Sequence, residues 1–361
     1  MTNREAQIFQ WISENPMISQ EELAAKAGIK RSSVAVHISN LMRKGYIKGK
    51  GYITNEPSYC TIIGAANIDI GGVSDEKLIG EDSNSGKVII SHGGVGRNIA
   101  HNMRLMGIGA KLITALGDDL YAHRIMETCN NLGIDISDAL RSVKDSTSIC
   151  VYISDSDMQM KAAIADMDIY RHLTPEFLDG KMDVINHGRL VMLDANIPGE
   201  SLELVAAKCK VPIYADPTTV KKAEKLKPIL GKLHTLTMNR KEAEVLCGVD
   251  VTDKESAAKA AHCMLEEGVK HVYVITPEYG IYAASQDEET MIEPRHRSVV
   301  NLSGAREAFM AGLVLAYTRH LLLRETAIVG LEAAGIAMES ASIINPVMAI
   351  DVIAARAGLE M

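Results

Sequence analysis

Near the C-terminus, residues 301–312 read Asn-Leu-Ser-Gly-Ala-Arg-Glu-Ala-Phe-Met-Ala-Gly. Gly304 and Ala305 predict a turn, and the small residues that follow predict a helix opened by this turn. Two charged residues, Arg306 and Glu307, come directly after the small pair. Taken alone, the stretch is an ordinary helix start, so its meaning depends on the segments that precede it.

Length and composition narrow the class of protein. The chain has 361 residues, 47% of them hydrophobic and 23% charged, enough for one large α/β domain and a small one. No apolar run reaches the ~18 residues that cross a bilayer, and residues 1–5 lack a secretory pattern. The six cysteines are scattered without a C-x-x-C pair, which favours reduced thiols over disulfides or a zinc site. We therefore expect a cytoplasmic protein with no membrane partner.

Charge is divided unevenly along the chain. Residues 1–54 hold eight Lys or Arg against four Glu, a net of +4. The remaining residues hold 30 basic against 42 acidic side chains, a net of −12, which gives the total of −8. A basic head on an acidic body suggests that the head has an anionic partner of its own.

The head carries the pattern of three short helices. Apolar spacing predicts a first helix around Ile8 and Ile12 and a third over residues 33–44. Between them, Ser19 precedes a helix over residues 20–27 as a cap, with an acidic residue at the capping-box position. The glycine-rich segment that follows the third helix, residues 45–53, predicts a two-stranded wing.

Helix, helix–turn–helix and wing together resemble a winged helix-turn-helix DNA-binding domain over residues 1–54. A recognition helix brings its N-terminal residues to base edges in the major groove, while basic side chains neutralise phosphates in a salt-dependent way. We expect Ser32 or Ser33 to cap this helix. The candidate DNA-binding residues are Arg31, Ser32, Ser33, His37, Lys48 and Lys50, with Arg43 and Lys44 as further phosphate contacts. The alternative is a dimerisation or docking domain with a solvated basic face.

A second domain is expected to begin at residue 59, because Pro57 discourages a helix from running through the preceding segment. Residues 59–65 are apolar and β-rich, as in a buried strand. Asn67 and Asp69 follow, and alternation points both side chains the same way at the ligand-binding end of the strand. Without further signals, an Asn-x-Asp pair would be read as a turn.

Later segments alternate between strand and helix patterns. This rhythm predicts right-handed βαβ units in a doubly wound, mostly parallel sheet. Asp194 and Asp216 stand at two strand ends, on the rim where such sheets bind ligands. The predicted strands are residues 109–116, 184–193, 211–216, 235–238 and 271–276.

Residues 91–100 read Ser-His-Gly-Gly-Val-Gly-Arg-Asn-Ile-Ala, and we expect Asn98 to open a helix. Glycines there would let a substrate approach the backbone closely. A glycine cluster alone is a weak signal. Here Gly-x-x-Asn-x-Asp is followed about 25 residues later by Gly-Gly-x-Gly-x-Asn, and the combination is more specific.

These motifs, with Asn239-x-x-Glu242 and the turn at residues 304–307, resemble the PfkB (ribokinase-like) kinases from residue 59 to the C-terminus. Residues 93–100 and 166–169 look most like pseudouridine kinases. The resemblance implies a ribokinase-like α/β fold with a small β lid at about residues 71–91, which covers the sugar and often mediates dimerisation. The implied substrate-binding residues are Asn67, Asp69, Gly93, Gly94, Asn98 and Asp166.

The same resemblance assigns the chemistry. Glu307 takes the place of the family's catalytic aspartate, Gly304 and Ala305 form the anion hole, and Arg306 stands where the family has glycine. The implied cofactors are ATP and Mg²⁺, with room for a monovalent cation, and the partners are a sugar or nucleoside, DNA and a second copy of the chain. Asn239, Thr276 and Gly280 are the implied nucleotide-binding residues, and Glu242 and Asn239 the metal-binding ones.

Two interpretations remain open at this point. Glu307 can be a working general base beside Arg306, which would neutralise phosphoryl charge. Alternatively, its extra methylene misplaces the carboxylate by about 1 Å, which can cost ~100-fold in rate. Pro277 and Glu278 also depart from the family's phosphate loop. The second interpretation leaves a sugar or nucleoside sensor that regulates DNA binding by linkage.

Overall fold

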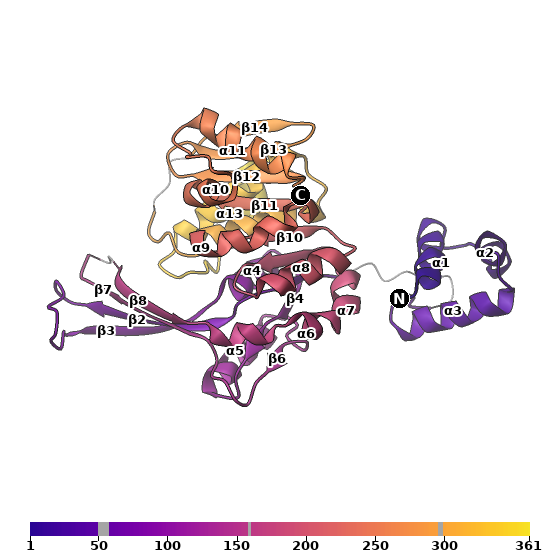
Figure 1. The fold of residues 1–361 in the computed structure, drawn as a ribbon, viewed down its shortest axis with the longest axis horizontal. Coiled ribbons are helices and arrows are strands. Elements are labelled where there is room, and N and C mark those ends of the chain that lie inside the picture. Colours follow the sequence, from indigo (N-terminus) through magenta and orange to yellow (C-terminus); the bar gives the residue numbers. More distant parts are fainter. Residues whose placement is uncertain (50–57, 158–159, 295–298) are drawn as a thin grey trace. The chain divides into compact units, whose positions relative to one another are not determined.

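The computed structural model describes residues 1–49, 58–157, 160–294 and 299–361 (Figure 1). The chain divides into two compact units, Met1–Ser58 and Tyr59–Met361, and each is described by itself. Within the described ranges, no helix is both long and apolar enough to cross a membrane.

The small unit consists of three helices, α1 (Asn3–Glu14), α2 (Gln20–Ala27) and α3 (Arg31–Arg43). Capping boxes begin the first two, and the one predicted at Ser19 is confirmed. Gly28 ends α2 in the left-handed conformation, as a C-terminal glycine does. The side chains between the helices are buried, and they are Ile8, Ile12, Ile18, Leu23, Val34, Ile38, Leu41, Tyr46 and Ile47.

The start of α3 differs from the prediction. The helix begins at Arg31, its N-cap is Lys30, and no side chain caps it. The predicted cap at Ser32 or Ser33 is therefore wrong, because both serines already lie inside the first turn. The predicted wing, residues 45–53, extends into residues 50–57, which lie outside the described residues.

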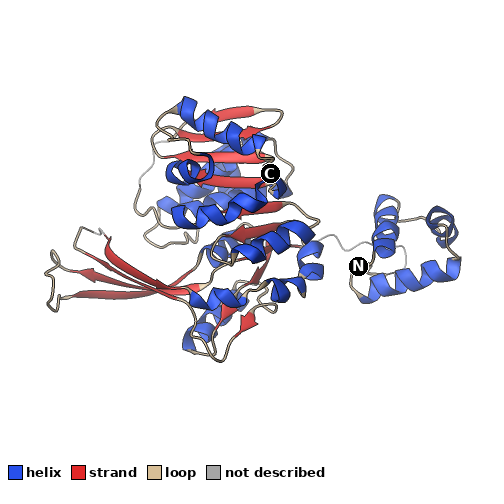
Figure 2. Cartoon of the chain, in the orientation of Figure 1, coloured by secondary structure: helices blue, strands red, loops and turns tan. Residues whose placement is uncertain are grey.

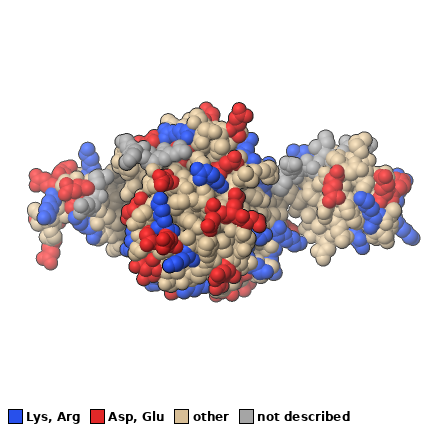
Figure 3. Space-filling view, turned by 90° about the horizontal axis from the view of Figure 1, so that it is seen from above, with Lys and Arg blue, Asp and Glu red and all other residues tan. Residues whose placement is uncertain are grey.

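On the face shown in Figure 3, basic and acidic side chains are interspersed over both units.

The large unit is built on an eight-stranded sheet with the order β14-β13-β12-β11-β10-β9-β1-β4. Pairing is parallel from β4 through β12 and antiparallel for β13 and β14. The strands are β1 (Tyr59–Ile63), β4 (Gly109–Ile113), β9 (Val191–Asp194), β10 (Ile213–Asp216), β11 (Thr235–Asn239), β12 (His271–Thr276), β13 (Gly280–Ser285) and β14 (Glu289–Ile292). A mostly parallel sheet is thus confirmed.

Helices cover both faces of this sheet (Figure 2). Successive residues of β1 point into different layers, since Ile62 belongs to one buried cluster and Ile63 to the other. The first layer contains α4 (Val95–Leu105), α5 (Leu120–Asn131), α12 (Ala305–Thr318), α13 (Leu323–Met338) and α14 (Ile350–Ala357). The second contains α6 (Pro175–Asp179), α7 (Met182–His187), α8 (Gly199–Lys208), α9 (Val220–Ala223), α10 (Arg240–Cys247) and α11 (Lys254–Glu266).

Four short elements and one close helix contact complete this body. The strands β5 (Ala115–Leu116) and β6 (Leu140–Arg141) pair in parallel, and 3₁₀ turns cover Asp168–His172 and Glu224–Lys232. The small residues after Gly304 have a packing role, because a Cβ at Gly312 would come within 2.9 Å of the Cα of Gly330.

A second sheet of four strands projects from this body (Figure 2). Its order is β3-β2-β7-β8, with β2 (Asn67–Ser74), β3 (Gly86–Gly93), β7 (Ile149–Ser154) and β8 (Met160–Asp166). The predicted lid at residues 71–91 covers only its first hairpin. The second hairpin was missed because every residue of β8 is exposed, so the strand carries no alternation between buried and exposed side chains.

Two further predictions are corrected by the fold. Residues 184–193 do not form one strand, because Met182–His187 is the helix α7 and β9 starts at Val191. A short apolar run does not distinguish a buried strand from a buried helix. In addition, α4 begins at Val95 with Gly94 as its N-cap, so Asn98 lies one turn inside the helix and does not open it.

Candidate active site

The turn before α12 explains why Gly304 is a glycine. Gly304 is the N-cap and has a φ of 84°, and a Cβ there would lie 2.1 Å from the carbonyl oxygen of Ile343. Arg306 and Glu307 lie in the first helical turn, where backbone N–H groups have no partner within the helix. Such a helix start favours an anion. The left-handed position is Gly304, so Arg306 itself needs no unusual backbone.

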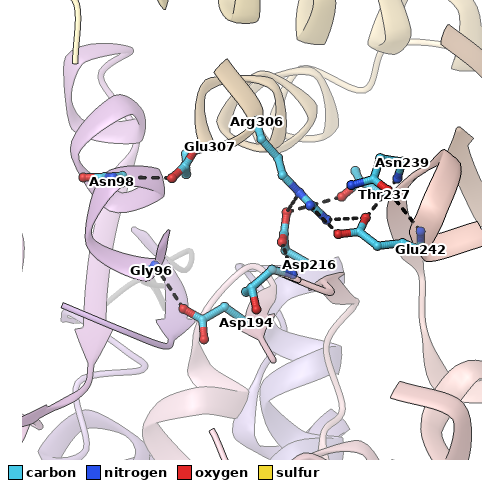
Figure 4. Close-up of polar contacts among 10 residues, drawn as sticks. Gly96, Asn98, Asp194, Asp216, Thr237, Asn239, Glu242, Arg306 and Glu307 are labelled. Carbon is cyan, nitrogen blue, oxygen red and sulfur yellow. Dashed lines mark hydrogen bonds and ion pairs between the residues drawn. The ribbon is translucent and has the colours of Figure 1, made fainter. Parts of the chain in front are cut away.

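Arg306 and Glu307 leave α12 in different directions, although they are neighbours in the sequence (Figure 4). Glu307 points toward α4, and its Oε1 accepts a long hydrogen bond of 3.4 Å from Nδ2 of Asn98. Burial raises the pKa of Glu307, and the charge of Asp216 raises it further, while Asn98 and Arg306 oppose this. A raised pKa makes this carboxylate a better proton acceptor near neutral pH.

Arg97 fixes the amide of Asn98. It is only 3% exposed, and its Nη2 donates to Oδ1 of Asn98 at 3.0 Å and to the carbonyl of His92 at 3.2 Å. With Oδ1 occupied, the donor side of the amide faces Glu307. Arg97 was not predicted, because α4 also contains His101, Asn102 and Arg104, so one more charged residue did not stand out in the sequence.

The expected sugar side forms one group around Asp69. Nδ2 of Asn67 donates to Oδ1 of Asp69 at 2.6 Å. Burial raises the pKa of Asp69, while this hydrogen bond and the charge of Arg97 lower it. Gly93 leaves room for the carboxylate, since a Cβ there would lie 2.2 Å from Oδ2 of Asp69. Gly94 combines a φ of 95° with close packing on Ala65.

Asp166 is not part of this group. Along the lid sheet it shares a register row with Ile149, Ile68 and His92, whereas Asp69 lies in the next row. Adjacent rows point to opposite faces of a sheet. Asp166 is exposed, and its Oδ1 accepts a 3.4 Å hydrogen bond from the backbone of Asp168.

Asp194 binds two backbone segments that lie next to the sugar-side residues in the sequence. Its carboxylate is fully buried, and its Oδ2 accepts hydrogen bonds from the backbone N–H groups of Ala65 at 2.7 Å and Gly96 at 3.1 Å. Burial raises the pKa of Asp194 to about 6, and backbone donors oppose this rise. Asp194 therefore ties the end of β1 to the start of α4 (Figure 4).

The side chain of Arg306, which points away from Glu307, makes three short charge-assisted hydrogen bonds to two carboxylates. Nε donates to Oδ2 of Asp216 at 2.7 Å, and Nη1 and Nη2 donate to the two oxygens of Glu242 at 2.6 and 2.9 Å. The side chains of Asp216 and Glu242 are 0% and 1% exposed. Two buried carboxylates thus share one guanidinium, as buried charges require a partner.

The residues expected to bind a metal do not fit that role. Asn239 and Glu242 form a capping box at the start of α10, in which Oε2 of Glu242 accepts from the backbone of Asn239 and Oδ1 of Asn239 accepts from the backbone of Glu242. Both oxygens of Glu242 also accept from Arg306. In the part of the chain that the structure describes, no three His, Cys, Asp or Glu side chains gather as a metal site.

Thr276 and Gly280, expected at the nucleotide, form the turn between β12 and β13. The hydroxyl of Thr276 donates to the carbonyl of Gly280 at 3.0 Å, and Gly280 has a φ of 89°. Glu278, in the same turn, accepts a hydrogen bond from Nη1 of Arg240 at 3.1 Å. Arg240 therefore partly neutralises the negative charge that Glu278 brings to this turn.

On the small unit, the exposed face of α3 differs from the predicted one. It consists of residues spaced by three or four, namely Ser32, Val36, Ser39 and Arg43, whereas Ser33 and His37 are half-buried. Arg31 pairs with Glu21 at 3.0 Å, and Lys44 with the buried Glu5 at 2.9 Å. Lys48 is exposed, and Lys50 lies outside the described residues.

Comparison with known proteins decides the family. The sequence pattern of the pfkB family carbohydrate kinases matches residues 57–350. The chain belongs to the pfkB family of carbohydrate kinases. A winged helix-turn-helix DNA-binding pattern matches residues 5–48. Both parts of the resemblance drawn from the sequence are thus confirmed.

Relatives of this pfkB chain include two Escherichia coli proteins. The uncharacterized sugar kinase YeiI is 36% identical over 97% of this chain and 98% of its own length. A pseudouridine kinase is 35% identical over 72% of this chain and 83% of its own.

Solved structures confirm the ribokinase-like fold. A carbohydrate kinase from Agrobacterium tumefaciens superposes with a TM-score of 0.75 at 26% identity, over 84% of this chain and 97% of that one. The Arabidopsis thaliana ribokinase, solved with ribose and ATP, gives 0.73 at 19% identity, over 85% of this chain and 100% of that one. At that identity, the second likeness concerns the fold alone.

Proposed function

We propose that the large unit is an ATP-dependent kinase that phosphorylates a hydroxyl of a ribose-like sugar or a pseudouridine-like nucleoside. The family and the 35% identity to a pseudouridine kinase support this proposal. The observation that carries it is the meeting of Glu307 with Asn98, because it brings a proton acceptor to the sugar side at the N-terminus of α12.

In this proposal, Asn67 and Asp69 bind sugar hydroxyls, since amide and carboxylate groups can donate to or accept from a diol in fixed geometry. Asn98 positions the reacting hydroxyl and Glu307 accepts its proton. The first turn of α12 stabilises the charge that develops on the phosphoryl group. ATP is the phosphoryl donor, and Mg²⁺ belongs to the proposal only as the ion that accompanies ATP.

We further propose a homodimer formed through the lid. Two alternate rows of the lid sheet, at Ile70 and at Gly72, face the same side and expose apolar side chains. An exposed apolar patch of this kind marks an interaction surface. The exposed residues of these rows are Val88, Ile90, Val151, Ile153 and Ile164. Sedimentation of the intact chain should show a dimer that Ile90→Lys converts to a monomer.

The alternative function is a sensor. The winged helix-turn-helix pattern supports DNA binding by residues 1–54, and a kinase domain (residues 59–361) with weak activity could bias this binding through its sugar ligand. By linkage, ligand and DNA would then change each other's affinity equally. The exposed face of α3 and Lys48 are the proposed DNA contacts, and Ser39→Asp with Arg43→Ala should weaken the binding.

A turnover assay separates the two functions. The intact chain is supplied with MgATP and either ribose, uridine or pseudouridine, and phosphorylated product is measured. The kinase proposal predicts turnover by the wild type with pseudouridine preferred. Binding of pseudouridine without turnover, together with turnover by Glu307→Asp, would show that the chain is a sensor whose carboxylate is misplaced.

A further inference from the structure

The Asp216–Arg306–Glu242 group holds a positive charge at the position where the family resemblance implied a metal. Asp216 ends β10, and Glu242 lies in the first turn of α10. Both carboxylates are buried, and Arg306 reaches them from α12 in a third part of the sequence. The guanidinium lies between the two carboxylates in Figure 4.

The oxygens of these carboxylates have little capacity left for another cation. Oε2 of Glu242 accepts from Arg306 and from the backbone of Asn239, and Oδ2 of Asp216 accepts from Arg306 and, at 3.5 Å, from Thr237. A carboxylate oxygen has two lone pairs. Oε2 of Glu242 and Oδ2 of Asp216 therefore have both lone pairs occupied.

Distance and charge both oppose a metal ion beside this arginine. Magnesium binds oxygen at about 2.0–2.1 Å in near-ideal octahedral geometry, whereas guanidinium nitrogens already lie 2.6–2.9 Å from the same oxygens. A divalent cation would have to displace the guanidinium or lie against a like charge in a buried setting, where repulsion is strong.

We propose that Arg306 is a built-in cation that takes the place of a divalent metal ion between Asp216 and Glu242. The protein itself then binds no divalent cation at this position, and the sugar side takes its ligand without one. The planar fork of arginine suits this role because it pairs both oxygens of one carboxylate and still reaches a second. If the arginine is removed, the two carboxylates become a site for a hard divalent cation.

Manganese binding tests this directly, because Mn²⁺ suits carboxylate oxygens and its electron paramagnetic resonance signal separates free from bound ion. The full-length chain is titrated with Mn²⁺ alone, so the result is independent of whether the chain is a kinase. The variants are Arg306→Ala, Glu242→Gln, Arg306→Ala with Glu242→Gln, and Arg356→Ala. Arg356 is the matched control, since it pairs both oxygens of Glu339 from another helix.

The wild type and Arg356→Ala should leave Mn²⁺ free up to about 1 mM, the weak end of oxygen-ligand sites. Arg306→Ala should bind one Mn²⁺ per chain, and adding Glu242→Gln should abolish the binding. Mn²⁺ should also raise the Tm of Arg306→Ala by about 3 °C or more, by mass action on the folded state. Sugar binding by the wild type should be unchanged in EDTA.

Two results would overturn the proposal. One is a wild type that binds Mn²⁺ in a way that Glu242→Gln abolishes, because the arginine then does not exclude the ion. The other is an Arg306→Ala chain that Mn²⁺ neither binds nor stabilises, whether or not this variant folds without metal. In that case the carboxylates are not a cation site that the arginine occupies.

Discussion

The two sides of the site satisfy their polar groups in different ways. On the sugar side, Asn67 donates to Asp69 and Asn98 accepts from Arg97, and a sugar hydroxyl could join these hydrogen bonds. On the other side, Asp216 and Glu242 are locked by three charge-assisted hydrogen bonds from Arg306. In the proposed assignment, the sugar side is open to a ligand, while the opposite side already holds its cation.

Glu307 is the proposed proton acceptor, so its removal should have the largest effect. Glu307→Gln keeps the size of the side chain but loses the proton acceptor, and general-base removal typically costs 10²–10⁴-fold in rate, here expected as a drop of about that size in kcat. Pseudouridine affinity should stay within about threefold, since the contact to Asn98 is long. Glu325→Gln, a capping residue of α13, is the control and should retain full turnover. Equal loss in both variants would remove Glu307 from the chemistry.

Arg306→Ala should disrupt the Asp216–Arg306–Glu242 group and leave the sugar side intact. It leaves two buried carboxylates without their cation, and breaking a buried ion pair costs roughly 3–5 kcal/mol. Denaturant unfolding without divalent cations measures this loss. The control Arg356→Ala removes a pair whose side chains are 33% and 30% exposed, and because solvent screens it more than the buried group, it should cost less stability. If Arg306→Ala is as stable as the control, the buried triad contributes nothing and the contrast between the two sides disappears.

Arg97→Met should weaken ligand binding at the sugar side and leave the Asp216–Arg306–Glu242 group intact. Without Arg97, the amide of Asn98 is free to turn, and the loss of hydrogen bonds from a charged group costs about 1.5–3 kcal/mol. We therefore expect pseudouridine to bind roughly 10–100-fold more weakly by calorimetry, with the stability of the Arg306 group unchanged. Arg104→Met is the control, because Arg104 lies on the same helix but donates to backbone carbonyls near its far end. Unchanged affinity in Arg97→Met would show that Asn98 needs no support.

The smallest effect is expected far from either side, at His234. Burial lowers the pKa of His234 to about 4, with neighbouring His271 and Lys270 adding to this. Between this pKa and its ordinary value of about 6.5, the unfolded chain binds a proton and the folded chain does not, so stability falls as pH is lowered. The Tm of His234→Gln should therefore fall less than that of the wild type between pH 7 and pH 4.5.

Other titrating groups do not affect the difference in Tm between His234→Gln and the wild type. Asp194, whose raised pKa acts with the opposite sign in the same range, is present in both proteins, and exposed His123→Gln is the control. Parallel pH curves for His234→Gln and the wild type would contradict the assigned role of His234.

Much of this molecule could be predicted from local sequence. Ser19 and Glu22, and likewise Asn239 and Glu242, lie three residues apart, so their capping boxes are written in the sequence. The Asn67 and Asp69 pair and the glycines before Asn98 are local signals of the same kind. They identified the family, and the parallel sheet followed from the alternation of strands and helices.

What could not be predicted depends on contacts between distant residues. Arg306 finds Glu242 and Asp216 across 64 and 90 residues, and neither partner carries a local sign of this pairing. The sequence placed Glu242 at a metal because the family motif was intact, whereas the folded chain satisfies it with arginine. The second lid hairpin was missed for a related reason, since exposed β8 pairs with β7 and carries no burial pattern of its own.

The most direct test of the contrast between the two sides is calorimetric titration of the intact wild-type chain with pseudouridine, once with Mg²⁺ and once with EDTA. Asp69→Asn is titrated in parallel. We predict one ligand per chain with the same Kd in both buffers, and a large loss of affinity in the variant. Binding that disappears in EDTA, or that Asp69→Asn leaves unchanged, would contradict the conclusion that the sugar side is complete without a metal.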